Sequence, residues 1–185
     1  MYRSVVTGSN NTGVRTTERQ GRDDRSHLTL VQLPQEVAGS TSWSVVGVLG
    51  ASPITHSAGL AAVDAPEFLV RGLPPEIGAG VVRYFAEQAL AGTRFRHGQV
   101  VLGHQLHELP LTLIRVTDLA DLVTIRRASP GATVLQVVWP DLNLCFPWQA
   151  GYALAPGLQP VHGRVGQVLE EDLAPVVRLG DRMRP

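Results

Sequence analysis

The sequence predicts an α+β fold, in which a mainly antiparallel mixed sheet of about five to seven strands packs with one main helix and one or two short helices. Three observations lead to this class. Short β-branched runs follow one another closely before residue 72, one stretch from about 75 to 91 has a helical period, and residues 133–138 are almost wholly apolar.

The length and composition predict one domain preceded by an arm. A chain of 185 residues with 44% hydrophobic content is long enough for one sizeable core. Residues 1–26 are rich in Gly, Ser, Thr, Asn and charge, so they cannot bury enough apolar surface to offset the entropy lost on ordering. We therefore expect a flexible N-terminal arm over 1–26 and a single α+β domain over 27–180.

The first half of the domain predicts consecutive strands. Residues 27–33 give a weak alternating signal, and residues 44–49 and 54–60 read as a hairpin around the turn Gly50-Ala51-Ser52-Pro53. A third strong run covers 67–72. The close spacing of these runs favours an antiparallel meander over parallel crossovers.

The main helix has clear start and stop signals. Proline is tolerated in a first turn and Glu76 suits the positive end of the helix dipole, while Gly92 is a natural stop. Apolar residues recur near the 3.6-residue period and should face the core. They are Ile77, Val81, Val82, Phe85 and Leu90.

The second half predicts strands near 99–102 and 111–116, then a short helix capped by Thr117 and Asp118 in which Leu119, Leu122 and Val123 face inward. The run 133–138 holds almost no polar residue except Gln136, so it should be a central strand covered on both faces. The tail, 165–179, suggests one short helix broken by Pro175.

The composition excludes several functional classes. Net charge is zero with 16 acidic and 16 basic residues interspersed, so no nucleic-acid footprint or polybasic membrane patch is present. Every basic residue is arginine, which excludes lysine Schiff-base chemistry and a Walker-type phosphate loop. The single cysteine, the lack of a long apolar run and the absence of a signal-peptide core predict a cytoplasmic protein without a membrane partner.

The stretch after the central strand is the best candidate for a binding site. Pro140 and Pro147 stiffen this loop, and large aromatic side chains can line a pocket or an interface. The alternative is that these rings close the core at one end of the sheet. The candidate ligand-binding residues are Trp139, Asp141, Phe146, Trp148 and Tyr152, bordered by His56 and Arg71.

Catalytic and metal sites have weaker support. Cys145 lacks a cysteine-enzyme signature and is expected to be a buried, inert thiol. His104 and His107 lack a nearby third ligand, so no metal site is expected. An enzyme would have to pair His56 or His104 with a carboxylate, either Asp141 or Glu67, within hydrogen-bond reach.

Three segments, taken in order, resemble a bacterial family called domain of unknown function 4262, over about residues 43–163. They are ITHSAGL at 54–60, APEFLVRGLPPE at 65–76 and QVVWPDLNLCFPWQAGY at 136–152. The resemblance implies a small soluble bacterial domain and confers no activity. His56 replaces an expected aromatic residue and Gln149 an expected aspartate, so if that acid were catalytic, this chain would lack it.

Three functions therefore compete. We favour a non-catalytic module that binds a small molecule or a protein through the loop 139–152, because no paired acid–base or metal-ligand spacing is present. The second is a hydrolase or transferase that uses the His/carboxylate pair. The third is a self-associating, immunity-like or phage-host interaction protein, for which a homodimer is expected. The sequence identifies no cofactor.

Overall fold

A computed structural model describes residues 15–18, 29–33, 42–103, 109–120, 122–165 and 177–179. Of the predicted arm only 15–18 is described, so the division into 1–26 and 27–180 stays a prediction. Within the tail predicted as a helix, 177–179 form a strand, and 166–176 lie outside the described residues. His104 and His107 lie outside them as well.

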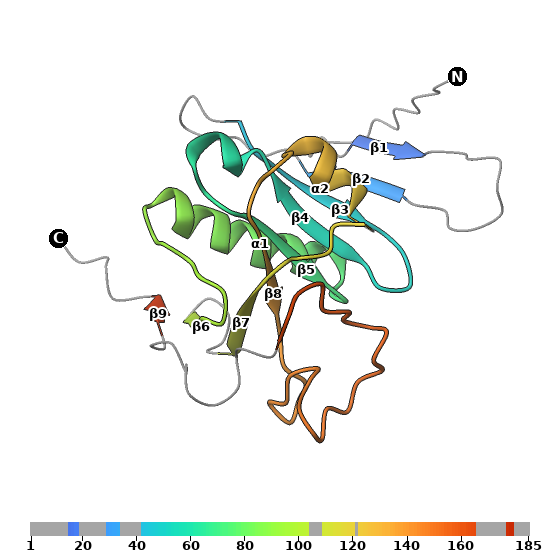
Figure 1. Ribbon diagram of the computed structural model, residues 1–185. Helices are drawn as coiled ribbons and strands as arrows, with labels where there is room; N and C mark the ends of the chain where they lie inside the picture. Colours follow the sequence, from blue (N-terminus) through green and yellow to red (C-terminus); the bar gives the residue numbers. More distant parts are fainter. Residues whose placement is uncertain are drawn as a thin grey trace.

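The described residues form one mixed sheet of nine strands in the order β1-β2-β3-β4-β5-β8-β7-β6-β9 (Figure 1). The strands are β1 (Arg15–Glu18), β2 (Thr29–Leu33), β3 (Ser44–Val48), β4 (Ile54–Ala58), β5 (Glu67–Arg71), β6 (Val100–Gly103), β7 (Pro110–Arg115), β8 (Val134–Val138) and β9 (Val177–Leu179). The helices are α1 (Pro75–Leu90), α2 (Val123–Ala128) and the 3-10 helix η1 (Leu60–Val63).

The pairing confirms the α+β class. Strands β1 to β5 form an antiparallel meander, as the short spacing between them predicts. The parallel pairs are β5 with β8 and β6 with β9, and the remaining pairs are antiparallel. The six strands from β3 to β8 form the centre of the sheet, and β1, β2 and β9 extend it at its two edges.

Strand β8 is the central strand that the apolar run 133–138 predicts. It lies between β5 and β7, and all five of its residues are buried. Gln136, its one polar residue, is fully buried and bonded through its amide to the backbone of a later segment. The apolar composition is therefore explained by cover on both faces.

Helix α1 covers one face of the sheet (Figure 1). Val81, Val82 and Phe85 are buried, as predicted, but Ile77 and Leu90 are 57% and 39% exposed. These two side chains lie in the first and last turns, where the helix extends past the core. The buried face instead includes small residues such as Gly78, which lets the helix approach strand β4 closely.

Helix α2 packs on the opposite face of the sheet. Leu122 and Ile125 join Leu69 and Val134 in a second apolar cluster. The predicted cap is wrong: α2 begins at Val123, and the Asp118 carboxylate instead accepts the Ala120 N–H at 2.9 Å. Leu119 packs against the cluster but Val123 is 37% exposed, because the helix starts later than predicted and turns another face inward.

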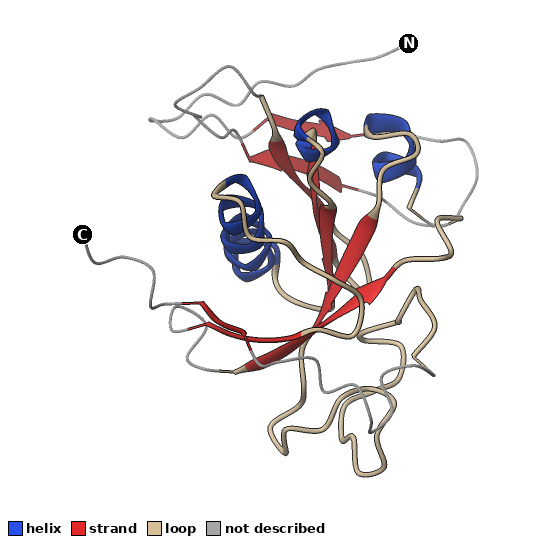
Figure 2. Cartoon of the chain, turned by 60° about the vertical axis from the view of Figure 1, so that its left-hand side comes forward, coloured by secondary structure: helices blue, strands red, loops and turns tan. Residues whose placement is uncertain are grey.

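The long segment after β8 leaves the sheet at the end opposite α2 (Figure 1 and Figure 2). Residues 139–165 contain neither helix nor strand. In the described part of the chain, no helix combines the length and apolar character needed to cross a bilayer.

Candidate ligand pocket in the aromatic loop

Asp141 organises the start of the aromatic loop, residues 139–152. Its Oδ1 accepts the N–H groups of Asn143 and Cys145, both at 2.9 Å, and its Oδ2 accepts the Ala153 N–H at 2.7 Å. Desolvation raises the pKa of this buried carboxyl, but these backbone bonds outweigh it and hold the pKa below its ordinary value. Asp141 is therefore ionised at neutral pH, and both its oxygens bind the loop itself.

The two rings after Asp141 stack on each other. The centroids of Phe146 and Trp148 are 5.1 Å apart and their planes differ by 4°. Gln149 closes the turn that carries both rings. Its Oε1 accepts the Phe146 N–H at 2.7 Å, and its backbone N–H donates to the Phe146 carbonyl at 2.9 Å. The stack is thus held by local hydrogen bonds as well as by ring contact.

Two buried glutamines fasten the end of the segment to β8. Gln159 accepts the Trp139 N–H and donates to the Trp139 carbonyl, both at 2.9 Å. Gln136 does the same for a later pair, donating to the Pro160 carbonyl at 2.8 Å and accepting the His162 N–H at 2.9 Å. Each side-chain amide bonds a backbone N–H and a backbone carbonyl, as a neighbouring strand would, so these backbone groups of the irregular segment stay paired.

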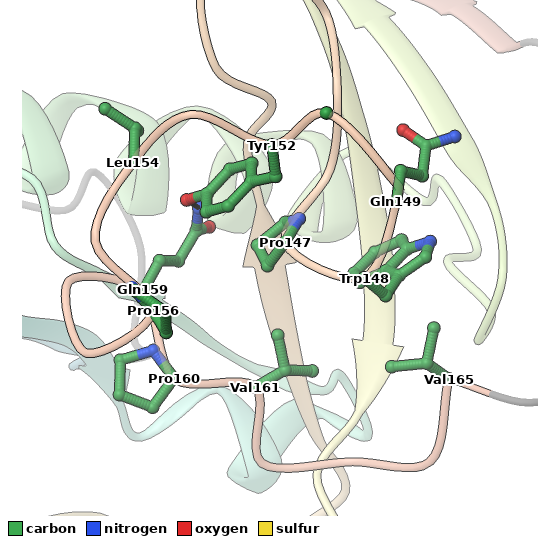
Figure 3. A pocket seen from close by; sticks show the side chains of 11 residues that line it. Pro147, Trp148, Gln149, Tyr152, Leu154, Pro156, Gln159, Pro160, Val161 and Val165 are labelled. Atoms are coloured by element: carbon green, nitrogen blue, oxygen red, sulfur yellow. Dashed lines mark hydrogen bonds between the residues drawn. The ribbon is translucent and has the colours of Figure 1, made fainter.

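Between the loop and this fastened segment lies an open cavity of about 400 Å³. Trp148 and Tyr152 lie on one side of it and Val161 and Val165 on another (Figure 3). The wall is completed by prolines, glutamines and small or aliphatic residues. These are Pro147, Gln149, Gly151, Leu154, Pro156, Gln159 and Pro160.

The described wall of this cavity is uncharged and offers hydrogen-bond donors. The Trp148 indole N–H makes no hydrogen bond to the described residues, and the exposed Gln149 amide is directed away from the other lining side chains (Figure 3). The Tyr152 hydroxyl oxygen accepts a long bond of 3.4 Å from Gln159, so its own proton remains available. The cavity therefore suits a flat, uncharged molecule with acceptor oxygens.

The structure brings only some of the predicted site residues together. Trp148 and Tyr152 line the cavity, and Phe146 stacks on the Trp148 ring without lining the cavity itself. Trp139 instead packs against the core on the α1 face, and its indole N–H donates to the Arg71 carbonyl at 2.8 Å. The Arg71 guanidinium donates to Nε2 of His162, which fixes it beside the loop but away from the cavity wall.

His56 lies in strand β4, fully buried. Its Nδ1 is 2.8 Å from the Ser57 carbonyl, which can only accept, so Nδ1 carries the proton and Nε2 accepts from the Thr124 hydroxyl at 2.8 Å. Burial lowers the pKa of His56, although the Ser57 carbonyl and the nearby Glu67 partly oppose this. The ring is a neutral link between β4 and α2.

Glu67 is also fully buried and accepts four hydrogen bonds. Ser57 and Ser129 donate their hydroxyls to it at 2.6 Å, and the N–H groups of Gly59 and Ala61 donate at 2.9 and 3.3 Å. Such a carboxylate is saturated with donors. It ties β4, η1 and the end of α2 to the start of β5, and leaves no lone pair directed at solvent.

Cys145 is a half-buried free thiol whose nearest polar partners are two carbonyl oxygens, at 3.8 and 3.9 Å. It is thus less buried than predicted, because it lies in the Asp141 turn and not in the core. Among the described residues, no group of three or more His, Cys, Asp and Glu side chains could hold a metal ion.

The sequence did not predict the second wall of the cavity. Gln159, Val161 and Val165 lie in a segment with no period, and their contact with Trp148 and Tyr152 depends on how two loops fold back on each other. The density of proline from Pro147 to Pro160 was the one available signal, since it indicates a rigid, irregular segment.

The fold and this cavity define a small α+β domain with a proline-stiffened aromatic pocket at the end of its central strand. Residues 38–153 match the family model described as Domain of unknown function (DUF4262). The chain belongs to this family. Comparison with curated proteins and with solved structures finds no match.

Proposed function

We propose that the chain is a non-catalytic binding module that holds an uncharged small molecule, or an uncharged segment of a protein, in the aromatic pocket. One observation carries the proposal: Trp148 and Tyr152 both form the wall of a cavity whose described lining contains no charged side chain. Pockets of about 300–1,000 Å³ that combine apolar walls with a few polar groups are the usual form of ligand sites.

The polar groups of the wall define the ligand further. The donor groups of Trp148 and Tyr152 are available, whereas the acceptor oxygens of Gln149 and Gln159 already accept backbone N–H groups. The pocket therefore favours a ligand that accepts hydrogen bonds, such as a molecule with carbonyl or ether oxygens. A planar or ring-shaped ligand would also gain contact with the indole face.

The loop is prepared for binding by its own hydrogen bonds. Asp141 holds three backbone N–H groups, and Gln159 fixes the opposite segment to Trp139. Binding would then order little additional chain, which preserves affinity because less conformational entropy is lost.

No arrangement of the described residues favours the hydrolase or transferase alternative over binding. His56 and Glu67 are fully buried, and the Asp141 carboxylate is occupied by backbone donors. A bacterial, cytoplasmic module is the setting that we propose, and a homodimer formed through the same loop remains the alternative for a self-associating protein.

Native mass spectrometry of the freshly purified protein tests the proposal. We expect a bound small molecule, or retention of a partner, that is lost in Trp148→Ala. Loss of a central aromatic anchor should weaken binding by about 2 kcal/mol, or roughly thirtyfold. Leu142→Ala is the matched control, since Leu142 is fully exposed on the same loop and does not line the cavity. Equal binding by Trp148→Ala and the wild type, with both folded, would contradict the proposal.

A further inference from the structure

A second cavity, of about 540 Å³, lies at the other end of β8. The segment that leads into β8, from Pro130 to Thr133, forms one wall, and the turn from Asp64 to Pro66, which leads into β5, forms another. Ala89 and Phe95 supply an apolar side from the end of α1 and the loop that follows it. The aromatic pocket and this cleft share no residue.

The walls of the cleft are held in place by the buried Glu67. It receives the N–H of Ala61, which lines the cleft, and the hydroxyl of Ser129, which adjoins the lining residue Pro130. The Glu67 N–H also donates to the carbonyl of Thr133, another lining residue, at 2.9 Å. Two walls from distant parts of the chain are thus joined through one residue, which gives a preorganised site.

The cleft presents one positive and one negative side chain. Arg94 and Asp64 both line it, and among the described residues neither forms an ion pair, with the other or elsewhere. The one hydrogen bond that the Arg94 guanidinium makes there is a long one, from Nη1 to the Asp64 carbonyl at 3.4 Å. The Arg94 guanidinium therefore lies beside the Asp64 backbone, and both exposed side chains retain most of their hydrogen-bonding capacity.

Asp64 ends η1 with a left-handed backbone conformation. Its φ is 58°, in the left-handed region that few non-glycine residues adopt. It caps η1 with its backbone N–H, which leaves the carboxylate free of any described capping bond. This is an ordinary conformation for the residue that ends a helix, and aspartate adopts it more readily than most residues do.

We propose that this cleft binds a zwitterionic α-amino acid with a bulky apolar side chain. Arg94 receives the α-carboxylate, Asp64 receives the α-ammonium group, and the side chain lies against Phe95 and the alanine and proline residues of the walls. A ligand with both charges matches the cleft better than a plain anion or cation, because each of these would leave one charged side chain unmatched.

Titration with L-phenylalanine, followed by amide NMR, tests this site. The amides of Ala65 and Ala132 are the reporters. 3-Phenylpropionate and phenethylamine are the matched probes, since each carries the same ring but only one of the two charges. We expect L-phenylalanine to bind at least tenfold more tightly than either. Equal binding of a singly charged probe, or no shift with L-phenylalanine up to its solubility limit, overturns the proposal.

Two variants locate the binding. Arg94→Gln and Asp64→Asn should each weaken L-phenylalanine binding at least tenfold, and asparagine is well tolerated at a positive φ. Arg96→Gln is the control, because Arg96 is exposed, lies two residues away and does not line the cleft. Unchanged binding in Arg94→Gln contradicts the assignment. Trp148→Ala should bind L-phenylalanine as the wild type does, so this result is independent of the aromatic pocket.

Discussion

Removing the buried Glu67 carboxylate should destabilise the whole domain. In Glu67→Ala, four donors lose their acceptor: two serine hydroxyls and the N–H groups of Gly59 and Ala61. An unsatisfied buried donor costs about 1–3 kcal/mol, but the hydroxyls can rotate and water can enter the vacated space. We therefore expect a loss of about 4 kcal/mol in the free energy of unfolding.

Glu67→Gln separates hydrogen bonding from the volume of the side chain. The amide oxygen can replace Oε1 and keep three donors, whereas the amide nitrogen cannot accept the Ser57 hydroxyl as Oε2 does. The Ser57 oxygen also accepts the Phe68 N–H, so its proton is left without an acceptor. A cost of about 1–2 kcal/mol follows from this one lost bond.

Urea unfolding at pH 7, followed by tryptophan fluorescence, measures both variants. Glu87→Ala, at an exposed position of α1, is the control and should change stability by less than about 0.5 kcal/mol. If Glu67→Ala costs less than about 1 kcal/mol of unfolding free energy, or no more than Glu67→Gln, then the carboxylate does not hold these segments together.

Three further predictions concern α1, His56 and the loop. Gly78→Ala should lower the free energy of unfolding by about 1–3 kcal/mol, because its Cβ would lie 2.7 Å from the Thr55 hydroxyl oxygen. Gly80→Ala has open space around it and should raise the free energy of unfolding by about 0.5–1 kcal/mol. Urea unfolding compares the two variants. The pKa of His56 is lowered on folding, so the unfolded chain binds more protons, and stability should fall as pH drops below about 6.5. His56→Gln should lack this part of the pH dependence, and an unchanged profile would rule out a neutral buried ring. Asp141→Ala should release the turn and speed labelling of the Cys145 thiol by a disulfide reagent, and equal rates in both proteins would show that the carboxylate does not order it.

Local patterns in the sequence predicted most of the fold. Strands β3, β4, β5 and β8 and helix α1 lie within a residue or two of the predicted ranges, because their apolar periods reflect which faces are covered. The short helix α2 was less predictable. Thr117 and Asp118 resemble a helix cap. Leu122, however, packs in the second apolar cluster, and this tertiary contact determines where α2 begins.

The site depended more on contacts between distant residues. Pro140 and Pro147 indicated a rigid aromatic loop, and Trp148 and Tyr152 line its cavity. Nothing local distinguishes Gln159, which pairs with Trp139 across 20 positions of the chain. The second cleft was not predicted at all, because Asp64 and Arg94 are 30 residues apart and meet only when η1 and the end of α1 are assembled.

In the function that we propose, the aromatic pocket binds an uncharged ligand through Trp148 and Tyr152. The most direct test is an NMR screen of small uncharged ring compounds with carbonyl groups. The screen follows the indole N–H signal of Trp148, and the loss of this signal in Trp148→Phe assigns it. We predict that binding compounds shift this signal and leave that of the core-packed Trp139 unchanged. Compounds that bind the domain without moving the Trp148 signal, or a screen in which none binds, would contradict the account.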